Sequence, residues 1–441
     1  MDVLVMTGQL LLGLSILIIL HEAGHFFAAR AFGIKVEKFY LFFDAWGFKL
    51  FSFNYKGCEY GMGWLPLGGY VKIAGMIDES MDTDQLAGPP QPWEFRSKPA
   101  WQRLIVMLGG VTVNIVLGIF IFWMLTFNLG EYYTPNNKLE NGIAPGIVGR
   151  SIGLQAGDKI TAVNGKEIVR FEEVNSSKVL FGNAELTINR NGETKSINVP
   201  GDILEEISDH GLNEFISARY IMGSLLKIEP ESNADKAGLK VGDSVLSVNN
   251  MPIRFYDEFQ AAIRQSSGKS VNISLIRNNQ PLTLDSKVST EGTIGVIPSA
   301  LGVPRENQQY GLMEALPVGA SKAWGSLTDN AKGLGKVFSG DVQANKAFTG
   351  PIGIATLFGK TVDWVKFWSL VGLLSMALAL MNLLPIPALD GGHSVFLLVE
   401  MVKGSPLSDK FMERAQMVGF VILVTLMVFV FGNDIFKHII N

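Results

Sequence analysis

The segment His21-Glu22-Ala23-Gly24-His25 has the spacing His-Glu-x-x-His and lies within the first hydrophobic run of the chain. On a helix, residues i and i+4 share one face, so His21 and His25 can both offer an imidazole to one ion. Glu22 can then reach a water held by that ion. A chance match is the alternative, but ionisable residues are costly in a spanning segment and mark functional sites there. The pattern therefore predicts a zinc centre within a membrane helix.

The composition indicates a chain that is partly in the membrane and partly soluble. Of its 441 residues 48% are hydrophobic, and the mean hydropathy is +0.25. The formal net charge of −4 and the pI near 5.8 argue against nucleic acid as a partner, because phosphate binding needs a concentrated basic face. The single cysteine, Cys58, cannot form a disulfide within the chain.

Four uncharged runs are long enough to cross a bilayer at about 1.5 Å per helical residue. They cover residues 3–20, 104–129, 367–389 and 415–432. A signal peptide is the alternative for the first run, but no Lys or Arg precedes it and no small-residue cleavage site follows. The sequence thus predicts a polytopic α-helical membrane protein with four transmembrane helices.

Basic residues suggest the orientation of these helices. Lys and Arg are frequent between Arg30 and Arg103 and again between Lys403 and Arg414, and none precedes the first run. The positive-inside rule puts both segments in the cytosol, with both termini and the insert between runs two and three outside. The histidine pair is then expected toward the cytosolic side of the membrane.

Residues 60–73 are too apolar for an ordinary loop and resemble two short strands around a turn at Gly68-Gly69. Non-helical backbone enters a membrane only where protein or a water-filled cavity satisfies it. We therefore predict a membrane-associated β-hairpin or sheet beside the metal. A cytosolic hairpin lying on the membrane surface is the alternative.

The second uncharged run has a stripe of small and polar residues, formed by Gly109, Gly110, Asn114 and Gly118. Small residues let helices approach closely, so this face is expected to pack on the first helix near the metal. For Asn114, a hydrogen bond between helices is preferred over a catalytic role.

The soluble insert contains an internal repeat. Residues 153–164 and 238–249 share the pattern G-L-x-x-G-D-x-[IV]-x-x-V-N, which resembles the signature of bacterial PDZ domains, although generic β-turn chemistry is an alternative. We predict two extracytoplasmic PDZ-like α+β domains, at residues 129–222 and 223–305. Residues 221–223 and 294–296 are interpreted as the groove strand of each copy. PDZ domains bind peptides by strand addition, so peptide sensing is available to the insert.

The last part of the chain divides into two segments. Residues 306–362 are amphipathic and punctuated by glycine, as is typical of helices at a membrane interface. Residues 363–441 hold the third and fourth runs. The third run ends in a stretch with two prolines that should break its helix within the membrane, and the next acid is Asp390. A carboxylate at such a break needs a compensating charge, and a zinc ion is the candidate.

Four features of the sequence belong together: the HEAGH segment in residues 1–128, the tandem repeat, the element F-T-G-P-I-G at residues 348–353 and the motif N-x-x-P-x-P-x-L-D-G at residues 382–391. Together they resemble the site-2 protease family, in its Gram-negative branch. The resemblance covers essentially the whole chain. It implies an intramembrane zinc endopeptidase with Zn²⁺ as cofactor. The implied zinc ligands are His21, His25 and Asp390, with Glu22 as general base. The implied substrate-binding residues are Asn382, Pro385, Pro387, Gly68, Gly69 and Tyr70.

The resemblance also implies a location and a class of substrate. It implies a multi-pass protein of the bacterial inner membrane that cleaves single-pass membrane proteins, such as an anti-sigma factor or remnant signal peptides, in regulated proteolysis. The tandem PDZ domains would gate substrate access. His393 is expected to support the site without binding the metal, and the oligomeric state stays open.

Two other classes of protein remain as alternatives. One is a catalytically inactive PDZ scaffold of the membrane, which the intact metal triad disfavours. The other is a transporter that binds an ion at its broken third helix, but such transporters usually repeat the broken helix in another half of the chain, and no second one is present here.

Overall fold

The computed structural model describes residues 2–66, 68–76 and 88–437 and divides the chain into two compact units. The first unit, here the membrane unit, combines residues 1–130 with 309–441. The second, here the insert unit, is formed by residues 131–308. A boundary between the units at these positions agrees with the change of composition after the second uncharged run.

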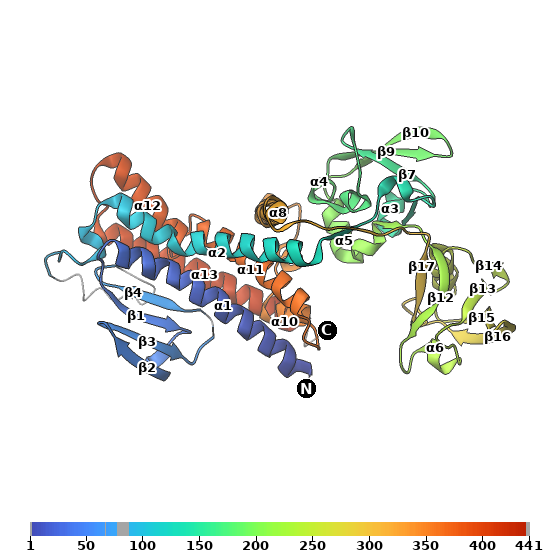
Figure 1. Ribbon diagram of the computed structural model, residues 1–441, viewed down its shortest axis with the longest axis horizontal. Coiled ribbons are helices and arrows are strands. Elements are labelled where there is room, and N and C mark those ends of the chain that lie inside the picture. Colours follow the sequence, from blue (N-terminus) through green and yellow to red (C-terminus); the bar gives the residue numbers. More distant parts are fainter. Residues whose placement is uncertain (1, 67, 77–87, 438–441) are drawn as a thin grey trace. The chain divides into compact units, whose positions relative to one another are not determined.

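The membrane unit is built from helices and one small sheet (Figure 1). Its helices are α1 (Asp2–Ala31), α2 (Ala100–Leu129), α8 (Leu312–Ser339), α9 (Ala344–Ala347), α10 (Pro351–Phe358), α11 (Trp364–Leu383), α12 (Asp390–Lys403) and α13 (Asp409–Ile435). Within the described residues, α1, α2, α11 and α13 are long and apolar enough to cross a membrane. The four predicted spans are therefore present as helices.

Helix α2 is the centre of the membrane unit, since it packs against α1, α8, α11 and α12. Its contact with α1 is a backbone-to-backbone approach. A Cβ atom on Gly24 would lie 2.3 Å from the Gly109 carbonyl oxygen, and one on Gly109 would lie 2.6 Å from that of Gly24. The expected small-residue face thus exists, although Gly118 faces Met376 of α11 instead of α1.

The segment between α1 and α2 forms a four-stranded sheet, not the simple hairpin expected from residues 60–73. Its strands are β1 (Val36–Leu41), β2 (Lys49–Tyr55), β3 (Cys58–Gly63) and β4 (Tyr70–Ile73), in the order β2-β3-β1-β4. Strand β1 lies between β3 and β4, parallel to the first and antiparallel to the second. The hairpin prediction is wrong because the connection from β3 to β4 crosses over β1. Strand β4 is consequently an edge strand.

The predicted break after the third span is confirmed. Helix α11 ends at Leu383, and α12 begins at Asp390. Between them lie Pro385 and Pro387, which have no backbone N–H group to donate the hydrogen bonds of a continuing helix. The residues after Leu389 therefore start a new helix, with Asp390 in its first turn.

The insert unit has two similar halves, here the first and second repeat. The first repeat contains β6 (Ile143–Pro145), α3 (Ile147–Ser151), β7 (Lys159–Val163), β8 (Lys166–Glu167), α4 (Ser177–Leu180), β9 (Ala184–Arg190), β10 (Glu193–Val199), α5 (Ile203–His210) and β11 (Ile216–Ala218). The second contains β12 (Ile221–Ile228), α6 (Asn233–Lys236), β13 (Ser244–Val248), β14 (Met251–Pro252), α7 (Tyr256–Gln265), β15 (Ser270–Arg277), β16 (Gln280–Lys287) and β17 (Val296–Leu301). Short strands β5 (Glu131–Tyr133) and β18 (Glu306–Gln308) pair where the unit begins and ends.

The two repeats have the same sheet order and the same buried ion pair. The orders are β10-β9-β7-β8 and, in the equivalent direction, β16-β15-β13-β14. In the first repeat Arg190 donates to both carboxylate oxygens of Asp158 at 2.7 Å. In the second, Arg277 donates to those of Asp243 at 2.7 and 2.8 Å. Both aspartates belong to the Gly-Asp signature, so the sequence repeat is a structural repeat.

Two expectations for the insert are corrected. Residues 221–223 and 294–296 do not supply equivalent strands to two copies, because β12 and β17 pair with each other in the second repeat. The equivalent pair in the first repeat is β6 with β11. The domain boundary after residue 222 also falls inside β12, so the second repeat begins by Ile221. The chain closes each repeat by pairing its two ends, which the sequence patterns did not reveal.

Candidate metal centre and active site

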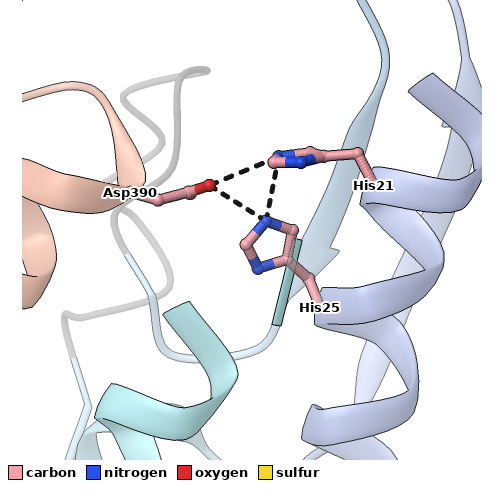
Figure 2. Close-up of side chains that lie close together, drawn as sticks. All are labelled: His21, His25 and Asp390. Carbon is pink, nitrogen blue, oxygen red and sulfur yellow. Dashed lines mark hydrogen bonds and ion pairs between the residues drawn. The ribbon is translucent and has the colours of Figure 1, made fainter. Parts of the chain in front are cut away.

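Two histidines of α1 and one aspartate of α12 converge on one point (Figure 2). The Nε2 atoms of His21 and His25 are 3.2 Å apart. Each lies 3.3 Å from Oδ2 of Asp390. All three residues are largely buried, with His21 8% and His25 7% exposed. Residues from the two ends of the sequence are thus brought within ion-binding distance.

The spacing of these three atoms fits a tetrahedral zinc ion. Donor atoms about 2.0–2.1 Å from a tetrahedral ion lie about 3.3–3.4 Å from one another. The three measured separations of 3.2, 3.3 and 3.3 Å match three corners of such a tetrahedron. In addition, Asp390 Oδ2 is a buried carboxylate oxygen with no hydrogen-bond partner among the described residues. A cation at the centre would satisfy it and would leave a fourth corner open.

The other ring nitrogen of each histidine has a partner on α2. His25 Nδ1 lies 2.8 Å from the carbonyl oxygen of Val106. A carbonyl can only accept, so Nδ1 carries the proton and Nε2 keeps a lone pair for a metal. This hydrogen bond fixes the tautomer that metal binding requires.

Asn114 performs the same task for His21. Its side-chain amide lies 3.0 Å from His21 Nδ1, and its Oδ1 atom is buried without a partner. The oxygen and nitrogen of an amide are nearly indistinguishable by shape. With the amide turned over, Oδ1 accepts from Nδ1–H, which leaves His21 Nε2 free for a metal. Asn114 is fully buried, and its backbone carbonyl accepts from Ser375 of α11 at 2.7 Å.

Gly110 provides the space for the histidine pair. A Cβ atom at this position would lie 2.4 Å from His21 Cε1 and 2.5 Å from His25 Nε2. Any other residue would displace a ring. The glycine predicted for helix packing therefore also shapes the site.

A cavity of about 290 Å³ opens beside the three residues. Of the predicted site residues, the described ones that line it are His21, Glu22, His25, Gly69, Tyr70, Asn382 and Asp390. Gly68, Pro385 and Pro387 are not among its lining residues. The prolines shape the break that precedes Asp390. His393 lines the cavity but stands outside the three-atom cluster.

Strand β4 reaches the cavity through a tight contact with α1. A Cβ atom on Gly69 would lie 2.6 Å from Ile18 Cγ2 and 2.7 Å from the Tyr40 carbonyl oxygen. A side chain at this position would separate the sheet from α1. Gly68 is crowded in a different way, because its Cβ would lie 2.8 Å from the Phe43 ring.

Tyr70 and Asn382 approach the site from opposite ends of the chain. The Tyr70 hydroxyl donates to Asp44 Oδ1 at 2.9 Å. Burial, and then this hydrogen bond, raise the pKa of the Tyr70 phenol, so it remains a donor at neutral pH. The Asn382 amide lies 3.2 Å from His21 Nε2, which puts it directly beside a candidate ligand atom.

Sequence reasoning missed parts of this site. The role of the Val106 carbonyl could not be predicted from the sequence, because every residue has a backbone carbonyl. Asn114 did carry a signal, an amide within an uncharged run, and the predicted hydrogen bond between helices is present between α2 and α1. The sequence did not show that its partner is His21 of the candidate metal centre. Asn114 both contacts α11 through its backbone and holds His21.

Comparison with known proteins agrees with this geometry. The model of peptidase family M50 matches residues 9–426. The chain belongs to peptidase family M50. It is 30% identical over 451 residues to the regulator of sigma-E protease RseP of Escherichia coli, with 97% of each chain covered. It is also 30% identical over 450 residues to the regulator of sigma E protease of Haemophilus influenzae, with 98% of each covered.

A third relative, from Vibrio cholerae, is named as a zinc metalloprotease. It is 29% identical to this chain over 449 residues, and the match covers 96% of this chain and 97% of the relative. The protein is therefore a zinc-dependent intramembrane protease of the site-2 type, as the sequence predicted. The similarity to RseP and the four apolar helices indicate an inner-membrane protein. This assignment excludes the inactive scaffold and the transporter as its main function.

Proposed function

We propose that His21, His25 and Asp390 hold the catalytic zinc and that Glu22 is the general base. The single observation that supports this most is the convergence of three donor atoms at tetrahedral spacing, with Glu22 lining the same cavity. Two neutral imidazoles and one carboxylate leave a position for water, as catalytic zinc requires.

The chain's own residues then have separate tasks. When bound, the zinc supplies a Lewis acid that lowers the pKa of water to about 7 and polarises the scissile carbonyl. Glu22 accepts a proton from the attacking water and delivers it to the leaving amide nitrogen. Val106 and Asn114 hold the two imidazoles in the required tautomer.

Substrate binding is assigned to β4 and the segment before Asp390. A peptide bond within a transmembrane helix is hidden by the hydrogen bonds of that helix, so the substrate must unwind locally. As an edge strand, β4 can pair with the unwound backbone, and Gly68, Gly69 and Tyr70 set its position against α1. Asn382 offers an amide donor and acceptor beside the scissile bond. Pro385 and Pro387 hold the break open.

The physiological substrates are proposed from the relatives. Their names include regulators of sigma-E, so single-pass membrane proteins such as an anti-sigma factor, or remnant signal peptides, are the proposed substrates. The charge distribution supports an orientation with both termini and the insert unit in the periplasm and the active site toward the cytosol. The two repeats are proposed to be PDZ-like domains that gate substrate access.

The test of this function is Glu22→Gln, which keeps the size of the side chain and replaces the carboxylate by an amide that cannot act as a base. The variant should contain as much zinc as the wild type and should not cleave a reporter with a single transmembrane segment. The matched control is Glu413→Gln, the same change at an exposed position of α13. Substantial cleavage by Glu22→Gln would show that Glu22 is not the base.

A further inference from the structure

Helix α13 makes a close backbone contact with the segment before Asp390. A Cβ atom on Gly419 would lie 1.5 Å from the carbonyl oxygen of Pro387. No other residue type fits there, so the α13 backbone rests directly on the break between α11 and α12. Because this break ends at Asp390, the same face of α13 is directed toward the candidate metal centre.

Gln416 lies on this face, one helical turn before Gly419. Its side chain is 4% exposed and lines the reaction cavity together with Glu22, Tyr70 and Asp390. Most of α13 is exposed: among its described side chains, the buried positions are Gln416, Gly419 and Asp434. A primary amide is therefore buried at the one part of the helix that borders the site.

An amide in this cavity can form hydrogen bonds with the backbone of an unwound substrate. An unwound substrate has backbone N–H and C=O groups that need hydrogen-bond partners in an apolar environment, because a buried group left unpaired destabilises the complex. A strand paired with β4 satisfies only the groups on the edge that faces β4. The groups on its other edge need partners from other elements. An amide can serve either kind of group, since it has two donors and an acceptor.

We propose that Gln416 is a substrate-contacting residue whose amide hydrogen-bonds the unwound substrate backbone on the edge that faces away from β4. This inference rests on the proposed function, because it requires a substrate extended beside β4. It adds α13 to the elements that bind the substrate, a helix in which sequence motifs indicated only a membrane span. A purely structural Gln416 would only stabilise the packing of α13.

Cross-linking tests contact directly. Cys58 is the single native cysteine, so a Cys58→Ala, Glu22→Gln chain gives an inactive background that retains substrate. In this background, on addition of a mild thiol oxidant, Gln416→Cys should form a disulfide with a single cysteine placed near the scissile bond of a one-span substrate. Met417→Cys is the matched control, since the neighbouring side chain is 48% exposed on another face of α13. A disulfide at residue 417 as strong as at residue 416, or none at residue 416, would overturn the proposal.

Kinetics provide the second measurement, in the otherwise wild-type full-length enzyme. Gln416→Leu has nearly the same volume and cannot form hydrogen bonds. We expect its kcat/KM to fall by about three- to ten-fold, the loss of one hydrogen bond, with unchanged zinc content and melting temperature. The control Met417→Leu should cleave like the wild type.

The outcomes separate this inference from the function on which it rests. If Glu22→Gln is inactive while Gln416→Leu cleaves like the wild type, the proposed function stands and the role of Gln416 is refuted. If Gln416→Leu loses zinc or melts early and Gln416→Cys gives no disulfide, Gln416 is structural and the proposal is refuted as well. Cleavage by Glu22→Gln would instead refute the proposed function.

Discussion

Replacing Asn114 tests whether hydrogen bonds from α2 prepare the metal centre. The amide is fully buried and lies 3.0 Å from His21 Nδ1. Asn114→Leu keeps the approximate volume and removes the only acceptor that the described structure offers to Nδ1–H. The ring can then rotate, or carry its proton on Nε2, and both changes oppose zinc binding.

The size of the effect follows from this geometry. Loss of a hydrogen bond to a metal-binding histidine typically lowers metal affinity about 10- to 100-fold. At about 1.4 kcal/mol for each factor of ten, that is about 1.4–2.7 kcal/mol. His25 keeps its bond to the Val106 carbonyl, so one of two histidines is affected and zinc should still bind at saturating concentration.

Zinc dissociation constants, measured by competition with a chromophoric chelator, provide the assay. Asn114→Asp is the informative partner variant, because a carboxylate can only accept from Nδ1–H at neutral pH. It should retain affinity close to that of the wild type. The control is Thr112→Val, since Thr112 is exposed on α2 and its hydroxyl bonds only within its own helix.

Two results would refute the reasoning. A dissociation constant for Asn114→Leu within two-fold of the wild type would show that the amide does not hold His21. Strong loss of zinc in Asn114→Asp, similar to that in Asn114→Leu, would show that the amide donates to Nδ1, which contradicts ligation through Nε2.

Three further outcomes are expected. Asp390→Ala should lower both zinc content, by elemental analysis, and activity; normal zinc content would require another third ligand, with His393 first to test. Asn382→Leu should keep zinc but slow cleavage, and less so for a substrate with a Gly-Pro interruption near the scissile bond; equal fractional losses would exclude a role in holding unwound substrate. In the insert unit, the hydrogen bond from Arg264 lowers the pKa of Glu214, so this contact between repeats stabilises the fold above the ordinary glutamate pKa of about 4.3 and is lost as pH falls through the lowered value. Acid unfolding of Glu214→Gln should therefore depend less on pH, and an unchanged pH profile would contradict this.

The sequence alone determined the features that depend on local periodicity. His21 and His25 share a helix face because four residues make about one turn, so the pair could be predicted before any contact was known. The four spans follow from uninterrupted apolar runs, and the break at Pro385 and Pro387 follows from the missing amide hydrogens. The repeat was visible because the same Gly-Asp turn must precede a strand in both halves.

The tertiary structure decided everything that depends on contacts between distant segments. Sequence could connect Asp390 with a zinc ion through the helix break and the family resemblance, but its distance from the histidines depends on how α12 packs against α2. The hairpin of β3 and β4 was predicted wrongly because neighbours in sequence were taken as neighbours in space, whereas β1 lies between them. Strands β12 and β17 pair with each other, although similar sequence patterns had been interpreted as equivalent strands of two copies. Asn114 reaches His21 and Gln416 reaches the cavity because Gly109 and Gly419 let neighbouring backbones approach closely. Such contacts leave no periodic pattern in a sequence, since they depend on the shape of two surfaces that meet only in the folded chain.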